Sequence, residues 1–125
     1  MKYVVSPSSV EPIQLIGREM RRLITSETVG AENVSVGVIS VPPGTEVLPC
    51  HSHEAEEALY IVQGEGEFWI DGHTGHFGAG DVVWYPFGSK HMIRNTGNQM
   101  LKAVFIFSPP MHPDRYTLYE DITFD

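Results

Sequence analysis

The chain of 125 residues has little of several features that mark particular protein classes. It contains one cysteine, Cys50, so no disulfide can form within it. Eight lysine and arginine residues stand against 16 acidic ones, and no basic run is longer than the pair Arg21-Arg22. Because the formal charge of −8 would repel a phosphate backbone, we expect no nucleic-acid partner.

Long apolar segments are also absent from the sequence. The longest uninterrupted run, at 58–62, is far shorter than the roughly 20 residues that cross a bilayer. The N-terminal residues MKYVVSPSS contain no apolar stretch of the roughly 7–15 residues found in a secretory signal. We therefore expect no membrane partner and a cytoplasmic location.

Turn-forming residues, in contrast, are abundant between short β-rich segments. Twelve glycines and nine prolines punctuate the chain, and no segment shows the apolar period of a capped helix. Strands are predicted at 18–25, 33–41, 57–62, 66–70, 81–85, 91–95 and 101–107, with a turn at Asp71-Gly72. The pattern predicts one all-β domain over residues 1–125, a sandwich or barrel with an N-terminal strand arm and a C-terminal tail.

Some predicted strands are apolar on both faces. Segments 58–62 and 104–107 are apolar at both parities, which indicates that a second sheet or a subunit covers each face. The large aromatic side chains are expected in the core or in the wall of a pocket, namely Trp69, Trp84, Phe105 and Phe107. His73 and His76 lie in a glycine-rich segment, DGHTGHFG, which is expected to be an exposed turn.

One short cluster carries metal-binding chemistry. His51, His53 and Glu57 are separated by two and four residues, so in one extended strand their side chains share a face. Imidazole nitrogens and a carboxylate oxygen are the donors used for Fe, Mn, Ni, Co, Cu or Zn. A His-x-His pair alone is weak evidence, because two surface histidines at this spacing are common. The spacing also differs from the helical metalloprotease motif, whose histidines stand four residues apart.

Two spaced strings of residues surround this cluster. The first, at 44–64, reads G-x6-H-x-H-x3-E-x6-G and consists of Gly44, His51, His53, Glu57 and Gly64. The second, at 80–95, reads G-x5-P-x-G-x2-H-x3-N and consists of Gly80, Pro86, Gly88, His91 and Asn95. Together they resemble the paired signatures of the cupin superfamily, with one extra residue between Gly44 and His51.

The resemblance implies a small single-domain cupin with an antiparallel jelly-roll barrel. It implies one divalent transition metal in the mouth of the barrel, held by His51, His53, Glu57 and His91, with the choice among Fe, Mn, Ni, Co, Cu and Zn left open. Such small barrels are often homodimers, so we expect a homodimer.

The function implied by the resemblance is a metal-dependent reaction on a small molecule. Relatives with this ligand set include dioxygenases, decarboxylases, sugar isomerases and lyases. We expect first an enzyme that activates oxygen, in the manner of a dioxygenase, on an oxygen-bearing and partly apolar substrate. The alternatives are a redox-neutral lyase, isomerase or decarboxylase, and a non-catalytic module that binds a metal or ligand. Small dimethylsulfoniopropionate lyases carry Tyr where this chain has Leu59, which counts against that activity.

Residues outside the ligand set suggest the nature of the pocket. Leu59 and Ile61 continue the inward parity of the first string and Ile93 that of His91, so we expect them to form an apolar wall. A carboxylate substrate would then need a cation.

Two arginines are candidates for that contact. Arg18 and Arg22 share one face of the predicted strand at 18–25, so they are candidate contacts for a substrate anion; the alternative is a solvated or dimer-edge strand. His112, Tyr116 and Tyr119 in the tail can add polar groups if the tail folds over the mouth.

Overall fold

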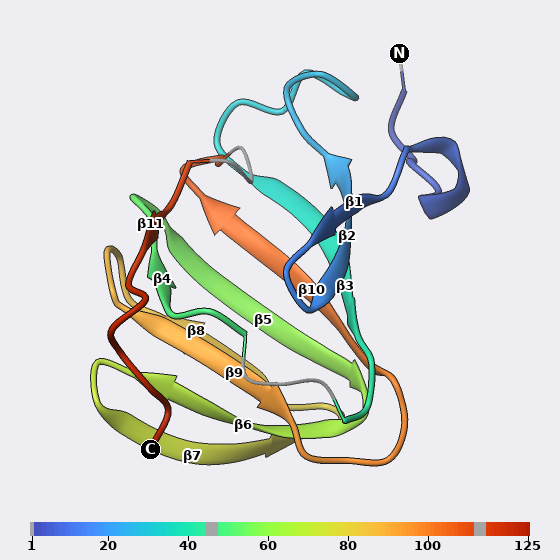
Figure 1. Cartoon of the computed structure of the whole chain (residues 1–125). Helices are drawn as coiled ribbons and strands as arrows, with labels where there is room; N and C mark the ends of the chain where they lie inside the picture. Colours follow the sequence, from blue (N-terminus) through green and yellow to red (C-terminus); the bar gives the residue numbers. More distant parts are fainter. Residues whose placement is uncertain (1, 45–47, 112–114) are drawn as a thin grey trace.

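The computed structural model describes residues 2–44, 48–111 and 115–125 and consists of two antiparallel sheets that face each other (Figure 1). The first sheet runs in the order β1 (Ile13–Leu15), β2 (Arg18–Ile24), β3 (Ser35–Val41), β10 (Leu101–Ser108), β5 (Glu56–Gln63) and β8 (Val82–Tyr85). The second runs in the order β11 (Thr117–Leu118), β4 (His51–Ser52), β9 (His91–Asn95), β6 (Glu65–Ile70) and β7 (His73–Gly78). A short 3-10 helix, η1 (Pro7–Ser9), precedes β1.

This arrangement confirms the predicted all-β, antiparallel jelly-roll fold. Each predicted strand is present, with boundaries within two residues of those expected. The segment 73–78 differs from the prediction, because it forms strand β7, hydrogen-bonded along β6, and is not a turn. The turn is confined to Asp71 and Gly72, both at positive φ (46° and 90°), as in a two-residue β-hairpin.

The segment from His51 to Glu57 is not one strand, contrary to the parity argument. β4 belongs to the second sheet and ends at Ser52, whereas β5 belongs to the first sheet and begins at Glu56. The chain crosses between the sheets through 53–55, where no strand pairing is made. His51 and Glu57 therefore face each other from opposite sheets, and the crossover brings them together.

The main core fills the space between the two sheets. β3 alternates between buried and partly buried residues along its whole length, as expected for a strand with one face on the core. Val41, Leu59 and Ile61 from the first sheet meet Phe77 and Ile93 from the second. Burying each such side chain contributes roughly 1.5–3 kcal/mol, so the barrel does not depend on a bound group for its cohesion.

The outer face of the first sheet carries exposed apolar side chains. Trp84 is 59% exposed, so its expected place in the core is wrong. The reason is parity, because Val83 and Tyr85 of the same strand point inward and leave Val82 and Trp84 outside. The Trp84 indole N–H donates to Glu56 at 2.7 Å.

The C-terminal tail covers part of the second sheet and encloses a smaller core. β11 pairs with β4, and Phe124 packs with Cys50 and Met92 behind the sheet. The Arg94 guanidinium lies 4.1 Å from the centre of the Phe124 ring and holds the end of the tail there. Within the described residues, no helix is long and apolar enough to cross a membrane.

A glycine in β3 makes room for an aromatic ring of the core. A Cβ at Gly37 would overlap the Phe105 ring and the Arg21 carbonyl oxygen. We expect Gly37→Ala to lower the free energy of unfolding by about 1–3 kcal/mol, because ring or backbone must move. Gly78→Ala is the matched control, since a Cβ there has nothing within 4 Å. Urea denaturation of both variants checks this; equal stability of the two would contradict the close packing of Phe105 on β3.

Candidate metal centre

Two histidines face each other across neighbouring strands of the second sheet. His51 in β4 and His91 in β9 are direct cross-strand partners, and their ring centroids lie 4.4 Å apart. His51 Nδ1 lies 2.9 Å from the Pro49 carbonyl oxygen and His91 Nδ1 lies 3.0 Å from that of Ser89. A carbonyl oxygen only accepts, so each Nδ1 carries the proton and each Nε2 keeps a lone pair.

His53 completes a three-imidazole cluster between the sheets. One ligand nitrogen from each of His51, His53 and His91 lies within 4.8 Å of the others, so the three can hold a metal ion. His53 Nε2 and His91 Nε2 are buried and have no hydrogen-bond partner within the described residues. Buried polar atoms without partners are costly, and a cation at their focus would satisfy them. The donor set therefore fits a transition metal.

Glu57 lies beside this cluster, on the opposite sheet. Its side chain is buried, with Oε1 at 3.2 Å from His53 Nε2 and 3.7 Å from His91 Nε2. Burial raises the pKa of the Glu57 carboxyl, and the nearby His53 and Arg18 oppose that shift. A dication at this position would favour the ionised carboxylate.

Two of the three histidines, His51 and His91, are uncharged at neutral pH. Burial lowers the pKa of His51 to about 4, although its hydrogen bond to Pro49 acts in the other direction. Burial also lowers the pKa of His91 well below its usual value, helped by the neighbouring His51 and His53. Neutral imidazole is the form that ligates metals, so little proton release from these two residues accompanies binding at pH 7.

Aromatic rings fix the orientation of the cluster. The Tyr85 ring stacks on His91 with centroids 4.1 Å apart and an interplanar angle of 19°. The Phe107 ring meets His53 edge-on at 4.7 Å. Both rings come from strands that flank β5, and both residues are direct partners of Glu57 in the sheet.

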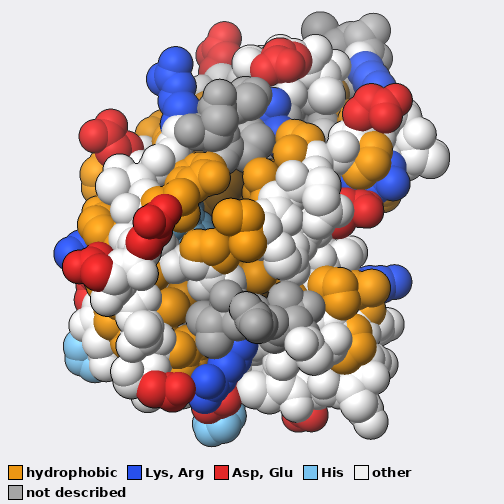
Figure 2. Space-filling view, in the orientation of Figure 1, with side chains coloured by type: hydrophobic (Ala, Val, Ile, Leu, Met, Phe, Trp, Pro, Cys, Tyr) orange, Lys and Arg blue, Asp and Glu red, His pale blue; other side chains and the backbone are white. Residues whose placement is uncertain are grey.

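An apolar cavity opens at this cluster. Leu59 and Ile93 line it, whereas Ile61 is fully buried deeper in the core and does not reach it. Further wall residues come from β2, β3 and β10, including Met20, Ile39 and Phe105. Hydrophobic side chains gather around a hollow on one face of the molecule (Figure 2).

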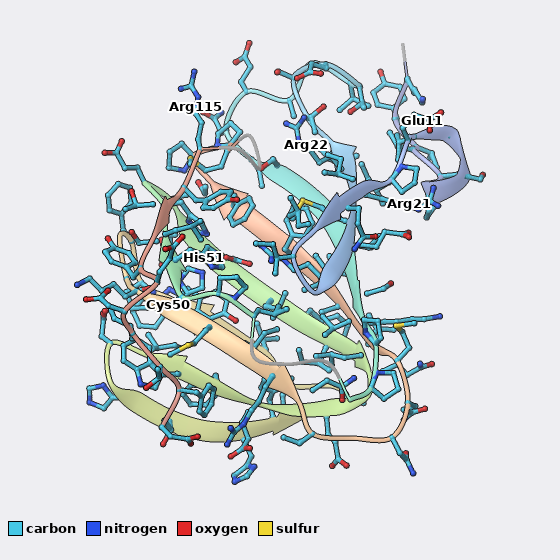
Figure 3. All side chains as sticks on the ribbon, viewed as in Figure 1. Glu11, Arg21, Arg22, Cys50, His51 and Arg115 are labelled. Carbon is cyan, nitrogen blue, oxygen red and sulfur yellow. The ribbon has the colours of Figure 1, made fainter. Side chains whose placement is uncertain are left out.

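The two candidate arginines of β2 lie in different places. Arg18 is partly buried and lines the cavity together with the three histidines and Glu57. Arg22 shares the face of Arg18 but lies four residues, or about 13 Å, farther along the strand. It pairs with Glu27 at 3.6 Å in a separate surface hollow, away from His51 (Figure 3).

The C-terminal tail supplies one side of the cavity. Tyr116, just before β11, lines the cavity, and its ring lies 5.8 Å from that of His51. The Tyr119 hydroxyl is hydrogen-bonded to the Ser52 hydroxyl at 2.8 Å and fastens the tail to β4. Tyr119 itself packs behind the sheet, and His112 lies outside the described residues.

Several cavity residues were not singled out in the sequence. Tyr85 ends a predicted strand with the inward parity of Val83, so the strand pattern contained the signal for its position. Met111 and Arg115 also line the cavity, but they lie outside the predicted strands, so no periodic pattern in the sequence indicated where their side chains would point.

Comparison with known proteins agrees with this geometry. A family model described as "Cupin domain" matches residues 37–107. The polyketide synthase CurC of Streptomyces cyaneus is 32% identical over 106 residues, which are 85% of this chain and 69% of CurC. An oxalate-binding protein of Thermotoga maritima is 38% identical over 89 residues, 70% of this chain and 73% of that protein. The crystal structure of a predicted oxalate decarboxylase of Thermotoga maritima superposes with a TM-score of 0.74, 29% identity and coverage of 86% of this chain and 99% of that one.

The three-imidazole cluster predicts metal binding that depends on each histidine. We expect the protein to bind about one divalent transition metal ion per chain. Removing a ligand in His51→Ala or His91→Ala should weaken binding by more than the roughly 10–100-fold lost when only an outer partner is removed. His76→Ala is the matched control, because the His76 side chain is 81% exposed and remote from the cluster. Elemental analysis and competition with a chromogenic chelator measure this; unchanged metal content in both ligand variants would show that the cluster is not the site.

Proposed function

The chain belongs to the cupin family, and on that premise we propose that it is a metal-dependent enzyme acting on a small, planar, oxygen-bearing molecule. The observation that carries the proposal is the cluster of three imidazoles in the wall of an apolar cavity, in which the buried Nε2 atoms of His53 and His91 have no hydrogen-bond partner among the described residues. Because the histidines line the cavity, an ion bound to them would contact a molecule that enters the cavity.

We propose that this ion is one divalent transition metal, held by His51, His53, His91 and Glu57. Three neutral imidazoles and one carboxylate around a dication leave a local charge of about +1 and, in six-coordination, two positions for other oxygen ligands. When bound, the metal supplies Lewis-acid polarisation of a substrate carbonyl, carboxylate or enediol oxygen. The Pro49 and Ser89 carbonyls hold the rings of His51 and His91 in the tautomer that this role needs.

The wall of the cavity supports a planar and largely apolar substrate. Leu59, Ile93, Phe105 and Phe107 offer contact area but no hydrogen bond to a ligand. A sugar in this cavity would leave several hydroxyls unpaired, at a cost of about 1–3 kcal/mol each. An aromatic or short aliphatic molecule would instead bury its body on these walls and present its oxygen atoms to the histidine cluster.

A redox-neutral reaction is the one we favour, although the sequence placed an oxygen-dependent reaction first. CurC is named as a polyketide synthase protein, and TcmJ of Streptomyces glaucescens, 29% identical over 84% of this chain, as a tetracenomycin polyketide synthase protein. Aromatic polyketides are oxygen-rich, planar molecules of the kind that suits an aromatic-walled cavity. We therefore infer an isomerisation, cyclisation, elimination or decarboxylation of such a molecule or a related acid.

An oxygen-dependent reaction is the second candidate. The observation that favours it is the donor set, because three histidines and one glutamate also suit Fe, Mn or Ni, which react with oxygen. The cavity walls would keep water from reactive species in either case. Oxygen consumption separates the two candidates directly.

Turnover by the metal-loaded protein tests the proposed function. Protein loaded separately with Mn, Fe, Ni, Co or Zn is incubated with aromatic acids, 1,3-diketones, aromatic polyketones and, for comparison, monosaccharides, under air and under nitrogen. We expect a product with unchanged mass, or smaller by water or carbon dioxide, equally under nitrogen, and none with His91→Ala. Oxygen uptake with an oxidised product would establish the second candidate in place of the first. Turnover of monosaccharides alone would contradict the apolar-substrate proposal.

We also propose that the chain forms a homodimer through the outer face of β10, β5 and β8. Five large apolar side chains there are 37–59% exposed, namely Tyr60, Val62, Val82, Trp84 and Ile106. The cross-strand pairing makes this patch continuous, because Tyr60 lies between Val82 and Val104. The outward residues at its centre are uncharged, so a second copy can approach without placing like charges together despite the formal charge of −8.

A charge in the patch should dissociate the dimer. We expect wild-type protein to elute with twice the chain mass of 14.0 kDa, and Val82→Glu to elute with the mass of one chain. The reason is the cost of burying an unpaired carboxylate in an apolar contact. Val4→Glu, at another exposed valine that lies outside the patch, is the control. Size-exclusion chromatography with light scattering measures both masses; a monomeric wild type, or a dimeric Val82→Glu, would rule out this interface.

A further inference from the structure

We propose that Arg18 and Tyr116 form a carboxylate-binding subsite beside the metal centre, and that the substrate is therefore a small planar acid. The proposal rests on the proposed function for the metal and deepens it by naming the group that the substrate carries. Arg18 comes from the N-terminal strand β2 and Tyr116 from the C-terminal tail, so the two ends of the chain meet at this point.

Arg18 lines the same cavity as the metal centre, and most of its guanidinium N–H donors are not used within the described part of the chain. Arg18 lines the cavity with the three histidines and Glu57. Its positive charge adds to the burial that lowers the pKa of His51 and His91, and it opposes the burial that raises the pKa of Glu57. Of its five N–H donors, one bonds the Ile16 carbonyl oxygen at 3.1 Å. Among residues 2–44, 48–111 and 115–125 its side chain makes no ion pair, so its planar fork remains available to a carboxylate.

The excess of positive charge in the cavity lining favours an anionic ligand. Among the described residues that line the cavity, Arg18 and Arg115 are the basic ones and Glu57 is the acidic one. With a dication bound and Glu57 ionised, the partly buried Arg18 adds a second positive charge to the +1 of the centre. The described lining holds no other carboxylate to offset these charges. Desolvated positive charge of this size favours an acidic ligand over its neutral analogue.

Tyr116 is held in place to serve as the second donor. The pairing of β11 with β4 and the hydrogen bond from Tyr119 to Ser52 fix the tail directly after Tyr116. Arg18, His51 and Tyr116 border one small hollow together. A carboxylate there would accept from the Arg18 fork and from the Tyr116 hydroxyl, while its planar body lies on the apolar wall.

The experiment compares benzoate with benzamide, which has the same shape and no charge, by isothermal titration calorimetry. Four proteins are titrated, both metal-loaded and metal-free: wild type, Arg18→Gln, Tyr116→Phe and Arg22→Gln. Arg22→Gln is the matched control, since Arg22 lies on the same strand but outside the cavity. Arg18→Lys is added because it keeps the charge and loses the fork, so it reports on the subsite should Arg18→Gln fail to fold.

We expect wild type to bind benzoate about tenfold or more tightly than benzamide. Arg18→Gln should abolish that preference, and Arg18→Lys and Tyr116→Phe should reduce it. Arg22→Gln should keep it. An unchanged preference in Arg18→Gln or Arg18→Lys would overturn the subsite, as would equal affinity of wild type for the two probes. A protein that binds no metal yet shows the Arg18-dependent preference would refute the proposed metal-dependent function while upholding the subsite.

Discussion

The arrangement of the site depends on one constraint, the direct pairing of His51 with His91 across two neighbouring strands. Each ring is held by a hydrogen bond from Nδ1 to the carbonyl two residues earlier in the chain. The shared geometry turns both Nε2 lone pairs toward the space between the sheets, where His53 and Glu57 arrive from the crossover and from β5. Satisfying those lone pairs by protonation is unfavourable, because burial disfavours the imidazolium form. A metal ion remains as the partner that suits them.

The crossover between the sheets places side chains on both sides of the candidate metal centre. Because β4 and β5 belong to different sheets, the candidate ligands from one short sequence segment enclose the site from both sides. The neighbours of Glu57 in the first sheet, Phe107 and Tyr85, then become the aromatic supports of His53 and His91. The strand pairing therefore determines the positions of both the candidate metal ligands and the residues of the apolar wall. Such a cavity suits a ligand that has a polar head group and an apolar body.

The sequence was sufficient for the strands, for the family resemblance and for the approach of His51, His53 and His91. Asn95, the last residue of the second string, shows why such patterns are informative: its side chain bonds the Val41 and Gln99 carbonyls and the Gly97 amide, and so closes the turn after β9. Parity failed where the chain leaves a strand, as between His51 and Glu57. Parity also predicts on which face of a strand a side chain lies, but not how far along the strand the site is. Arg18 and Arg22 were therefore equivalent candidates in the sequence, although of the two only Arg18 lines the cavity.

The part played by the tail was beyond sequence reasoning for a different reason. Arg115 and Tyr116 lie outside the predicted strands. The position of the tail depends on the pairing of two-residue strands and on contacts of Tyr119 and Phe124 with the second sheet. Such short pairings leave no periodic pattern.

X-ray absorption of the zinc-loaded protein tests the central claim most directly, because it reports the atoms around the ion without reference to any reaction. We expect a shell of nitrogen and oxygen atoms at about 2.0–2.2 Å, with outer-shell scattering from three imidazole rings in the wild type and from two in His91→Ala. A sulfur scatterer at about 2.3 Å, or an imidazole signal unchanged in His91→Ala, would contradict it.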